Sequence, residues 1–280
     1  MAKRSTSLIT VAVVVSFATM ALTFAWLRLT SGEEEADVYE KKTIGQRFHE
    51  ETTLTWRKAT AETLSFKINR PAQFKTYSDA ETLALPKPSF QGPSFENVLQ
   101  NRRSKRNYST TPLTMVQLSQ LLFAAQGSTG KSFNTLLRTS PSGGALYPFE
   151  IYPIVHNIEG LEPGIYHYDV RRHQLERLMT GDIRREITAA GLQQEMLGEA
   201  AVVFILTAIF DRSRFKYGER GLRYIYMEAG HISQNIALQA TSLGLGSVPM
   251  GAFLDEAVNH LLGLDGEQEA AIYLHPVGVL

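Results

Sequence analysis

The stretch Ala201-Val-Val-Phe-Ile-Leu-Thr-Ala-Ile209 decides the fold. It is apolar over the length of one strand, which indicates a central β-strand that is buried on both faces. A long helix is predicted downstream, over residues 223–243, because apolar residues recur at helical spacing from Ile225 to Leu243. Gly244 stands where the left-handed residue that ends a helix is usually found. We therefore expect a mixed fold with this strand near its centre.

Outside these two elements, the chain alternates between helical and extended patterns. Ser94 and Thr114 stand at cap positions, and Thr114 forms a capping-box pattern with Gln117. The expected elements are helices at 95–100 and 116–125, a strand at 150–155, a hairpin at 164–170 and 174–178, a helix at 255–262 capped by Asp255, and a strand at 271–274. They follow no regular βαβ period, which favours an α+β fold over a doubly wound sheet.

The composition excludes several kinds of site. The chain has 280 residues, and its 28 basic side chains balance its 28 acidic ones, so the charge gives no reason to expect a nucleic-acid partner. It has no cysteine, which excludes disulfides, thiolate catalysis, Cys-ligated zinc and iron–sulfur clusters. The seven histidines form no HxxxH or HExxH pair, so we predict no metal site.

The N-terminal part predicts a membrane anchor. Lys3 and Arg4 precede an uncharged apolar run from Leu8 to Leu27, about as long as one bilayer crossing. No A-x-A site closes the run, which favours an uncleaved single-pass helix over a cleaved signal peptide. The charge before the run predicts that the rest of the chain lies outside the cytoplasm. The expected organisation is an anchor at 1–28, a linker at 29–45, an N-terminal arm at 46–93 and the main domain at 94–280.

Two segments of the main domain have the composition of a ligand site. Arg102-Arg103-Ser104-Lys105-Arg106 places four cations and a hydroxyl together, and guanidinium groups match the paired oxygens of a phosphate. Ser140-Pro-Ser-Gly-Gly-Ala-Leu-Tyr-Pro148 contains two adjacent glycines, which let the backbone approach a flat ligand. A solvated turn and an ordinary loop are the alternatives. A P-loop at 127–132 is rejected, because its first glycine would be Ala125 and a helix precedes it.

These segments, with others in the same order, resemble the nitroreductase-like flavoproteins. The additional motifs are Arg220-Gly-Leu-Arg223, Glu228-Ala-Gly-His231, Gln234-Asn235, Gly244-Leu-Gly246 and Gly251-Ala-Phe253, together with His49-Glu-Glu-Thr52 and Phe74-Lys-x-Tyr77 in the arm. The set is most similar to the SagB-type dehydrogenases, the azoline oxidases of thiazole and oxazole peptide biosynthesis, and covers roughly residues 46–280. The resemblance implies an α+β sandwich, usually an intertwined homodimer with FMN at the subunit interface.

The resemblance also implies which residues would hold FMN. Arg102 and Ser104 would face its phosphate and ribityl end with Arg103 as their neighbour, and Arg106 would stabilise the anionic reduced flavin at the N1–C2=O edge. Six more residues would lie near the ring, namely Pro141, Ser142 and Gly143 from the partner subunit, Gln194 through its amide, and Gly251 and Ala252 through backbone N–H groups near flavin N5. The protein would supply placement and electrostatics, and the flavin the electron chemistry.

Lys216 and Tyr217 are the candidate catalytic residues. In the azoline oxidases that this chain resembles, a Lys-Tyr pair at this place is thought to move the proton removed from the ring carbon. Neighbouring cations would favour the basic form of such a group, and three are near in sequence, Arg214, Arg220 and Arg223. A basic surface loop is the alternative. On the long helix, His231 is expected to be a core histidine and Glu228 the charge partner of an arginine.

Three functions remain open from the sequence. The first is an FMN-dependent oxidoreductase that takes hydride from a small-molecule or peptide substrate and passes the electrons to O₂ or a quinone. The second is an NAD(P)H-dependent nitro or quinone reductase of the same fold. The third is a membrane-tethered flavin-binding or scaffold protein without turnover. The third is motivated by residues 276–280, which lack the basic residue that the family commonly places near the C-terminus.

Overall fold

The computed structural model describes residues 42–56, 58, 69–133 and 135–280. The chain divides into two units between Thr53 and Leu54, and each is described by itself. The described part of the first unit contains helix α2, Ile44–Glu51, which begins at a reciprocal capping box between Thr43 and Gln46. All the elements that follow belong to the second unit.

The structure corrects the prediction of a membrane anchor. The run from Leu8 to Leu27 lies outside the described residues. Among the residues that are described, no helix combines the length and the apolar composition that a bilayer crossing needs. We therefore assign neither a transmembrane helix nor an extracytoplasmic position to this chain.

An antiparallel sheet of seven strands, in the order β1-β6-β5-β4-β7-β9-β8, forms the centre of the second unit. The strands are β1 Glu81–Ala84, β4 Phe149–Val155, β5 Gly164–Asp169, β6 Gln174–Thr180, β7 Val202–Ile209, β8 Leu245–Ser247 and β9 Glu269–Val279, and a separate pair is formed by β2 Ser128–Ser132 and β3 Thr135–Arg138. β7 pairs with β4 and β9, and seven of its eight residues are buried. The predicted central strand is thus confirmed, as is the β5–β6 hairpin.

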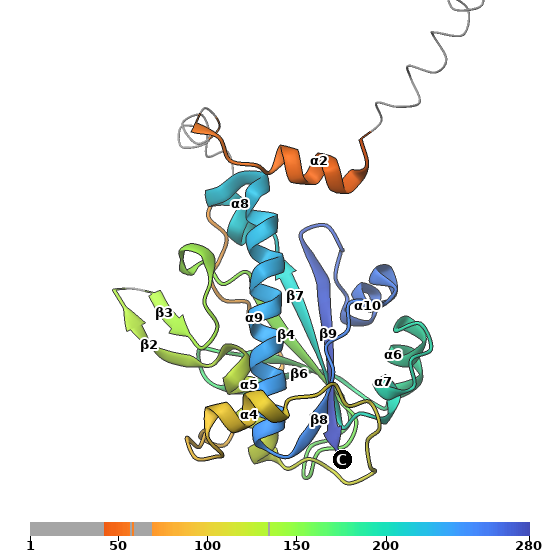
Figure 1. Cartoon of the computed structure of the whole chain (residues 1–280). Helices are drawn as coiled ribbons and strands as arrows, with labels where there is room; N and C mark the ends of the chain where they lie inside the picture. The colour runs from red at the N-terminus through yellow and green to blue at the C-terminus, as the bar shows by residue number, and fades with distance from the viewer. Residues whose placement is uncertain (1–41, 57, 59–68, 134) are drawn as a thin grey trace, which may run out of the picture. The chain divides into compact units, whose positions relative to one another are not determined.

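Helices cover both faces of this sheet (Figure 1). They are α4 Phe95–Asn101, α5 Met115–Gln126, α6 Arg184–Ala190, α7 Met196–Glu199, α8 Asp211–Tyr217, α9 Gly221–Ser242 and α10 Asp255–Leu262, with short 3₁₀ turns at η1 Gly143–Ala145 and η2 Gly218–Arg220. Phe204 and Leu206 of β7 belong to a core cluster with α5 and α9, whereas Val203 and Ile205 belong to one with α6, α7 and α10. Alternate side chains of one strand therefore enter two separate cores.

Most of the predicted caps are confirmed, and one is wrong. Ser94 accepts from the Asn97 N–H at the start of α4, and Thr114 forms its capping box at the start of α5. Gly244 has φ +71° just beyond α9. Asp255, in contrast, is the first residue of α10, and Leu254 stands at the cap position without a side-chain hydrogen bond. The carboxylate of Asp255 still lies where the helix dipole favours negative charge.

A buried charge network ties α8 to the sheet. Arg212 of α8 forms an ion pair with Glu150 of β4 at 2.6 Å, and both side chains are less than 5% exposed. His167 lies between Glu150, at 3.0 Å, and Glu176, at 2.8 Å. Burial would raise the pKa of Glu150, but the charges of Arg212 and His167 lower it to about 2. Burial would lower the pKa of His167, but its hydrogen bonds to the two carboxylates raise it to about 9.

Replacing Arg212 by Ala should lower the free energy of unfolding by about 3–5 kcal/mol, because Glu150 would lose its ion pair while it stays buried near a second carboxylate, Glu176. Arg214 provides the matched control, since its ion pairs with Asp211 and Glu219 are partly exposed. Arg214→Ala should cost less than about 1 kcal/mol. Urea denaturation followed by circular dichroism gives both values, and equal losses in the two variants would contradict this ranking.

Candidate active site

The cationic segment Arg102–Arg106 lies along the edge of the sheet. Helix α4 ends at Asn101, and the chain then runs beside β8, where Ser104 forms a parallel bridge with Ser247. The Lys105 N–H donates to the Ser247 carbonyl at 3.0 Å. In the part of the chain that the structure describes, none of the four cations forms an ion pair with a carboxylate, and three of them are exposed. Apart from Arg103 Nη1, which donates to the carbonyls of Gln100 and Arg102, their donors are therefore available to an anionic ligand.

Tyr108 fixes this segment to the sheet. Its ring packs over Gly278 of β9, where any larger residue would collide with it, and lies close to Gly246 of β8. Its hydroxyl donates to the Lys105 carbonyl at 2.9 Å, and the Ser109 N–H donates to the Val279 carbonyl at 2.8 Å. The cations are thus held by backbone pairing and by one aromatic ring.

Gln194, Gly251 and Ala252 lie together near the same edge. The Gln194 side-chain amide donates to the Ala252 carbonyl at 3.0 Å. Gln194 follows two residues with a left-handed backbone, Leu192 and Gln193, both at φ +59°. Gly251 and Ala252 are exposed, and Gly251 stands four residues beyond Ser247, so at most roughly 14 Å of extended chain separates it from the residue that pairs with Ser104.

The loop from Pro141 to Tyr147 has a strained backbone. Gly144, Ala145 and Tyr147 have φ values of +65°, +54° and +48°, of which only the first is easy for its residue type. The Tyr147 N–H donates to Ser142 Oγ at 2.8 Å, and the Arg138 guanidinium lies 4.7 Å from the centre of the Tyr147 ring. Buried contacts therefore hold Tyr147 in place and leave Pro141 and Gly143 exposed. Strain of this kind is typical of functional loops.

The predicted catalytic pair meets this loop. A Cβ atom added at Gly144 would lie 2.5 Å from Tyr217 Oη and 2.8 Å from Lys216 Nζ, so the ends of both side chains lie directly over this glycine. Lys216 Nζ lies 5.2 Å from the centre of the Tyr217 ring, which packs edge-on against Tyr224. Arg214 does not add an unbalanced cation beside them, because Asp211 and Glu219 pair with it.

Within one chain, the two groups of predicted residues do not meet. A Cβ atom added at Gly143 would lie 3.6 Å from Tyr224, in the first turns of α9, whereas the cations lie beside β8, which follows the end of α9 at Ser242. Eighteen residues of helix separate Tyr224 from Ser242, or roughly 27 Å. The cations, Gln194, Gly251 and Ala252 form one half of the candidate site, and Pro141–Gly143 with Lys216 and Tyr217 form another.

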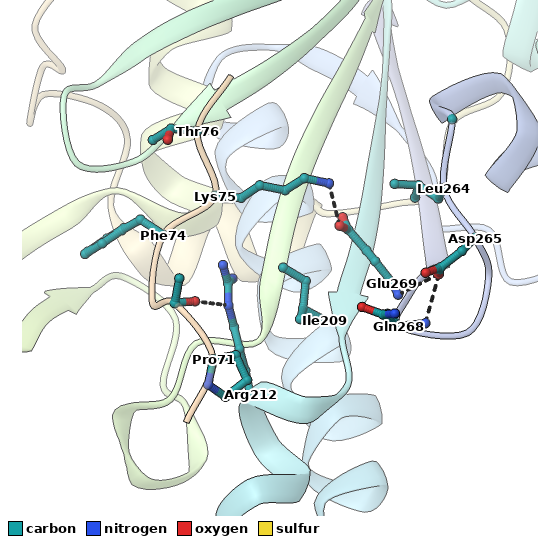
Figure 2. A pocket seen from close by; sticks show the side chains of 12 residues that line it. Pro71, Phe74, Lys75, Thr76, Ile209, Arg212, Leu264, Asp265, Gln268 and Glu269 are labelled. Carbon is teal, nitrogen blue, oxygen red and sulfur yellow. Dashed lines mark hydrogen bonds and ion pairs between the residues drawn. The ribbon is translucent and has the colours of Figure 1, made fainter. Parts of the chain in front are cut away.

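A cavity of about 600 Å³ lies elsewhere, between residues 71–76 of the arm and the far end of the sheet (Figure 2). None of the predicted site residues lines it. Its two cations are already paired, Lys75 with Glu269 at 2.6 Å and Arg212 with Glu150. Figure 2 shows Lys75 extending towards Glu269, and a charged ligand would have to displace that carboxylate.

The predictions for His231 and Glu228 of α9 have different outcomes. His231 is exposed, so the prediction of a core histidine is wrong. Glu228 is buried and faces Arg138, which agrees with a charge partner, but it also faces Ser142 of the strained loop. The contact with Ser142 was not expected.

Comparison with known proteins gave matches of three kinds. The model of the Nitroreductase family matches residues 99–279. The protein MJ1384 of Methanocaldococcus jannaschii is 40% identical over 198 residues, which are 71% of this chain and 97% of that protein. The microcin B17-processing protein McbC of Escherichia coli is 32% identical over 146 residues, which are 50% of this chain and 54% of McbC.

Among solved structures, the fold is similar to that of a chain in the E. coli microcin synthetase McbBCD complex with truncated pro-MccB17 bound. The TM-score is 0.55 at 25% identity, over 83% of this chain and 86% of that one. These matches confirm the resemblance drawn from the motifs and the α+β fold that it implies. The matches to McbC and to the synthetase chain support the SagB-type branch.

Replacing Gly278 by Ala should detach the cationic segment from the sheet. The new Cβ would lie 2.6–2.8 Å from three Tyr108 atoms, one of them Cβ, so the ring cannot simply rotate away. We expect a loss of about 1–3 kcal/mol in stability and faster hydrogen exchange at the Lys105 and Ser109 amides. Gly130→Ala is the control, since no atom lies within 4 Å of the added carbon. Unchanged exchange at both amides in Gly278→Ala would refute the role given to Tyr108.

Proposed function

Because this chain belongs to the nitroreductase family, we propose that it is an FMN-dependent oxidoreductase of the SagB-type dehydrogenase branch. It takes hydride from its substrate and passes the electrons to O₂ or a quinone. The similarity to a microcin-processing protein supports a peptide substrate over other small molecules.

The unpaired cations at the edge of the sheet carry this proposal. Arg102, Ser104 and Arg106 follow one another along β8 with no ion pair among the described residues. The chain has as many acidic as basic side chains, yet these guanidinium groups have no carboxylate partner within the described ranges. They are suited to bind a phosphate and a ring that becomes anionic on reduction. The residues present therefore fit FMN.

Each residue of this half has a separate task. Arg102 and Ser104, with Arg103 beside them, bind the phosphate and ribityl end, and Arg106 balances the charge of the reduced ring. Gly251 and Ala252 leave backbone N–H groups accessible, and the bond from Gln194 to the Ala252 carbonyl keeps that backbone in place. When bound, FMN accepts the hydride and delivers the electrons.

A second copy of the chain supplies the other half of the site. Since Pro141, Ser142 and Gly143 lie about 27 Å along α9 from the cations, one chain cannot place both around one small ring. The outward face of α9 carries Tyr226 and Met227, which are 52% and 59% exposed. Burial of this face against a partner would join the loop of one chain to the cations of the other.

Lys216 and Tyr217 act on the substrate. They lie over Gly144, two residues from Ser142, and so at the loop that approaches the ring. The pair accepts the proton that leaves the substrate carbon as hydride departs.

The purified chain should be yellow and should release FMN on heating. Arg106→Ala should weaken FMN binding at least about tenfold through loss of one charge-assisted contact, measured by quenching of flavin fluorescence. Arg185→Ala, which removes an exposed arginine of α6, is the matched control and should bind like the wild type. A colourless protein that takes up no added FMN would exclude the proposal. Rapid anaerobic bleaching by NADPH would instead indicate the reductase.

Met227→Glu should shift the protein from dimer to monomer, because the new charge would be buried in the interface. Light scattering after size-exclusion chromatography measures the shift, and FMN binding should fall with it. Met179→Glu is the matched control on β6, where the side chain is 40% exposed. Tight FMN binding by a monomeric variant would contradict a shared site.

A further inference from the structure

The burial of Glu228 has no adequate explanation in the packing of α9. The residue lies on the buried face of the helix, three positions after Ile225 and four before Ile232, and is 2% exposed. Its Oε1 has no hydrogen-bond partner among the described residues, and the same is true of Gln126 Nε2 nearby. An ionisable group buried with an unsatisfied oxygen costs stability.

Three elements face the Glu228 carboxyl. Ser142 comes from the strained loop, Arg138 from the end of β3 and Gln126 from the end of α5. Burial raises the pKa of Glu228 and these three groups lower it, which leaves it at about 7. Arg138 is the charged group among them, and its guanidinium also donates to Gln126 Oε1 at 3.0 Å. Both forms of the carboxyl are consequently populated near neutral pH.

The Ser142 hydroxyl has only one hydrogen to donate. Its oxygen already accepts the Tyr147 N–H at 2.8 Å. An ionised Glu228 can only accept, so it takes the hydroxyl hydrogen and turns it into the protein. A neutral Glu228 can itself donate to Ser142 Oγ, which leaves the hydroxyl hydrogen available to a ligand outside the loop.

We propose that Glu228 is a positioning residue that acts through Ser142, its proton deciding whether this hydroxyl donates into the protein or to a bound ligand. The inference rests on the proposed function, in which the ligand is FMN. The neutral carboxyl frees a donor for the acceptor edge of the ring and removes a negative charge from the neighbourhood of an anionic ligand. FMN therefore binds more tightly to the form with neutral Glu228. By linkage, its affinity falls as rising pH ionises this carboxyl.

The test is the dissociation constant of FMN for the full chain, from flavin fluorescence, at about pH 6 and about pH 8. The FMN phosphate itself titrates near pH 6, so wild type is compared with Glu228→Gln at each pH. Glutamine keeps a neutral donor, so the variant should resemble wild type at the lower pH. At the higher pH, the dissociation constant of the wild type should then be roughly tenfold larger than that of the variant. Glu159→Gln, which removes an exposed carboxylate between β4 and β5, should follow the wild type.

Ser142→Ala gives a second test that leaves Glu228 and the core intact. Wild type should bind FMN more tightly than this variant at the lower pH and lose most of that advantage at the higher one. If FMN binds but both comparisons are independent of pH, the inference is overturned and the proposed function stands. If the wild type binds no FMN at either pH, both are overturned.

Discussion

The ion pair between Arg212 and Glu150 is the contact on which the site's second half depends. Arg212 lies in the first turn of α8, and besides pairing with Glu150 it donates to the Ala72 carbonyl of the arm and the Tyr147 carbonyl of the strained loop. One buried guanidinium thus orients helix, arm and loop against β4. Its charge is tolerated only because Glu150 and the carbonyl groups replace the water it has lost. The same helix carries Lys216 and Tyr217 over Gly144 one turn later, so their position follows from this pair.

The half of the site that contains the cations depends on a different constraint, which is the need to cover the edge strand β8. β8 is a three-residue strand at the end of the sheet, and its open side would pair with any extended chain. Residues 102–106 cover it through the Ser104–Ser247 bridge, and Tyr108 completes the cover over Gly278. Because cationic side chains are also a common protection for edge strands, one segment meets both needs. It closes the sheet, and it presents unpaired donors at a fixed place.

Sequence reasoning found the elements whose signals are local. The apolar run of β7, the periodicity of α9 and the caps at Ser94 and Thr114 each depend on neighbours in the chain. It missed α6, α7 and α8. It also missed β8, because three residues gain strand geometry only by pairing with β9. His231 was misplaced because it is exposed although the next residue, Ile232, is buried. No pattern along one chain could show that the two halves of the site are separated by most of α9.

Glu228 shows how a signal in the sequence can be present and still be misread. A carboxylate inside the apolar stripe of α9 was visible, and a charge partner was the economical interpretation because charges are rarely buried alone. The structure does provide that charge in Arg138, yet it also leaves one carboxylate oxygen unsatisfied. A purely structural pair would be expected to satisfy both oxygens, since the cost of an unmade bond exceeds the gain from a made one. Incomplete satisfaction beside a strained loop agrees with the change of proton proposed for Glu228, and under that proposal α9 is part of the site as well as of the core.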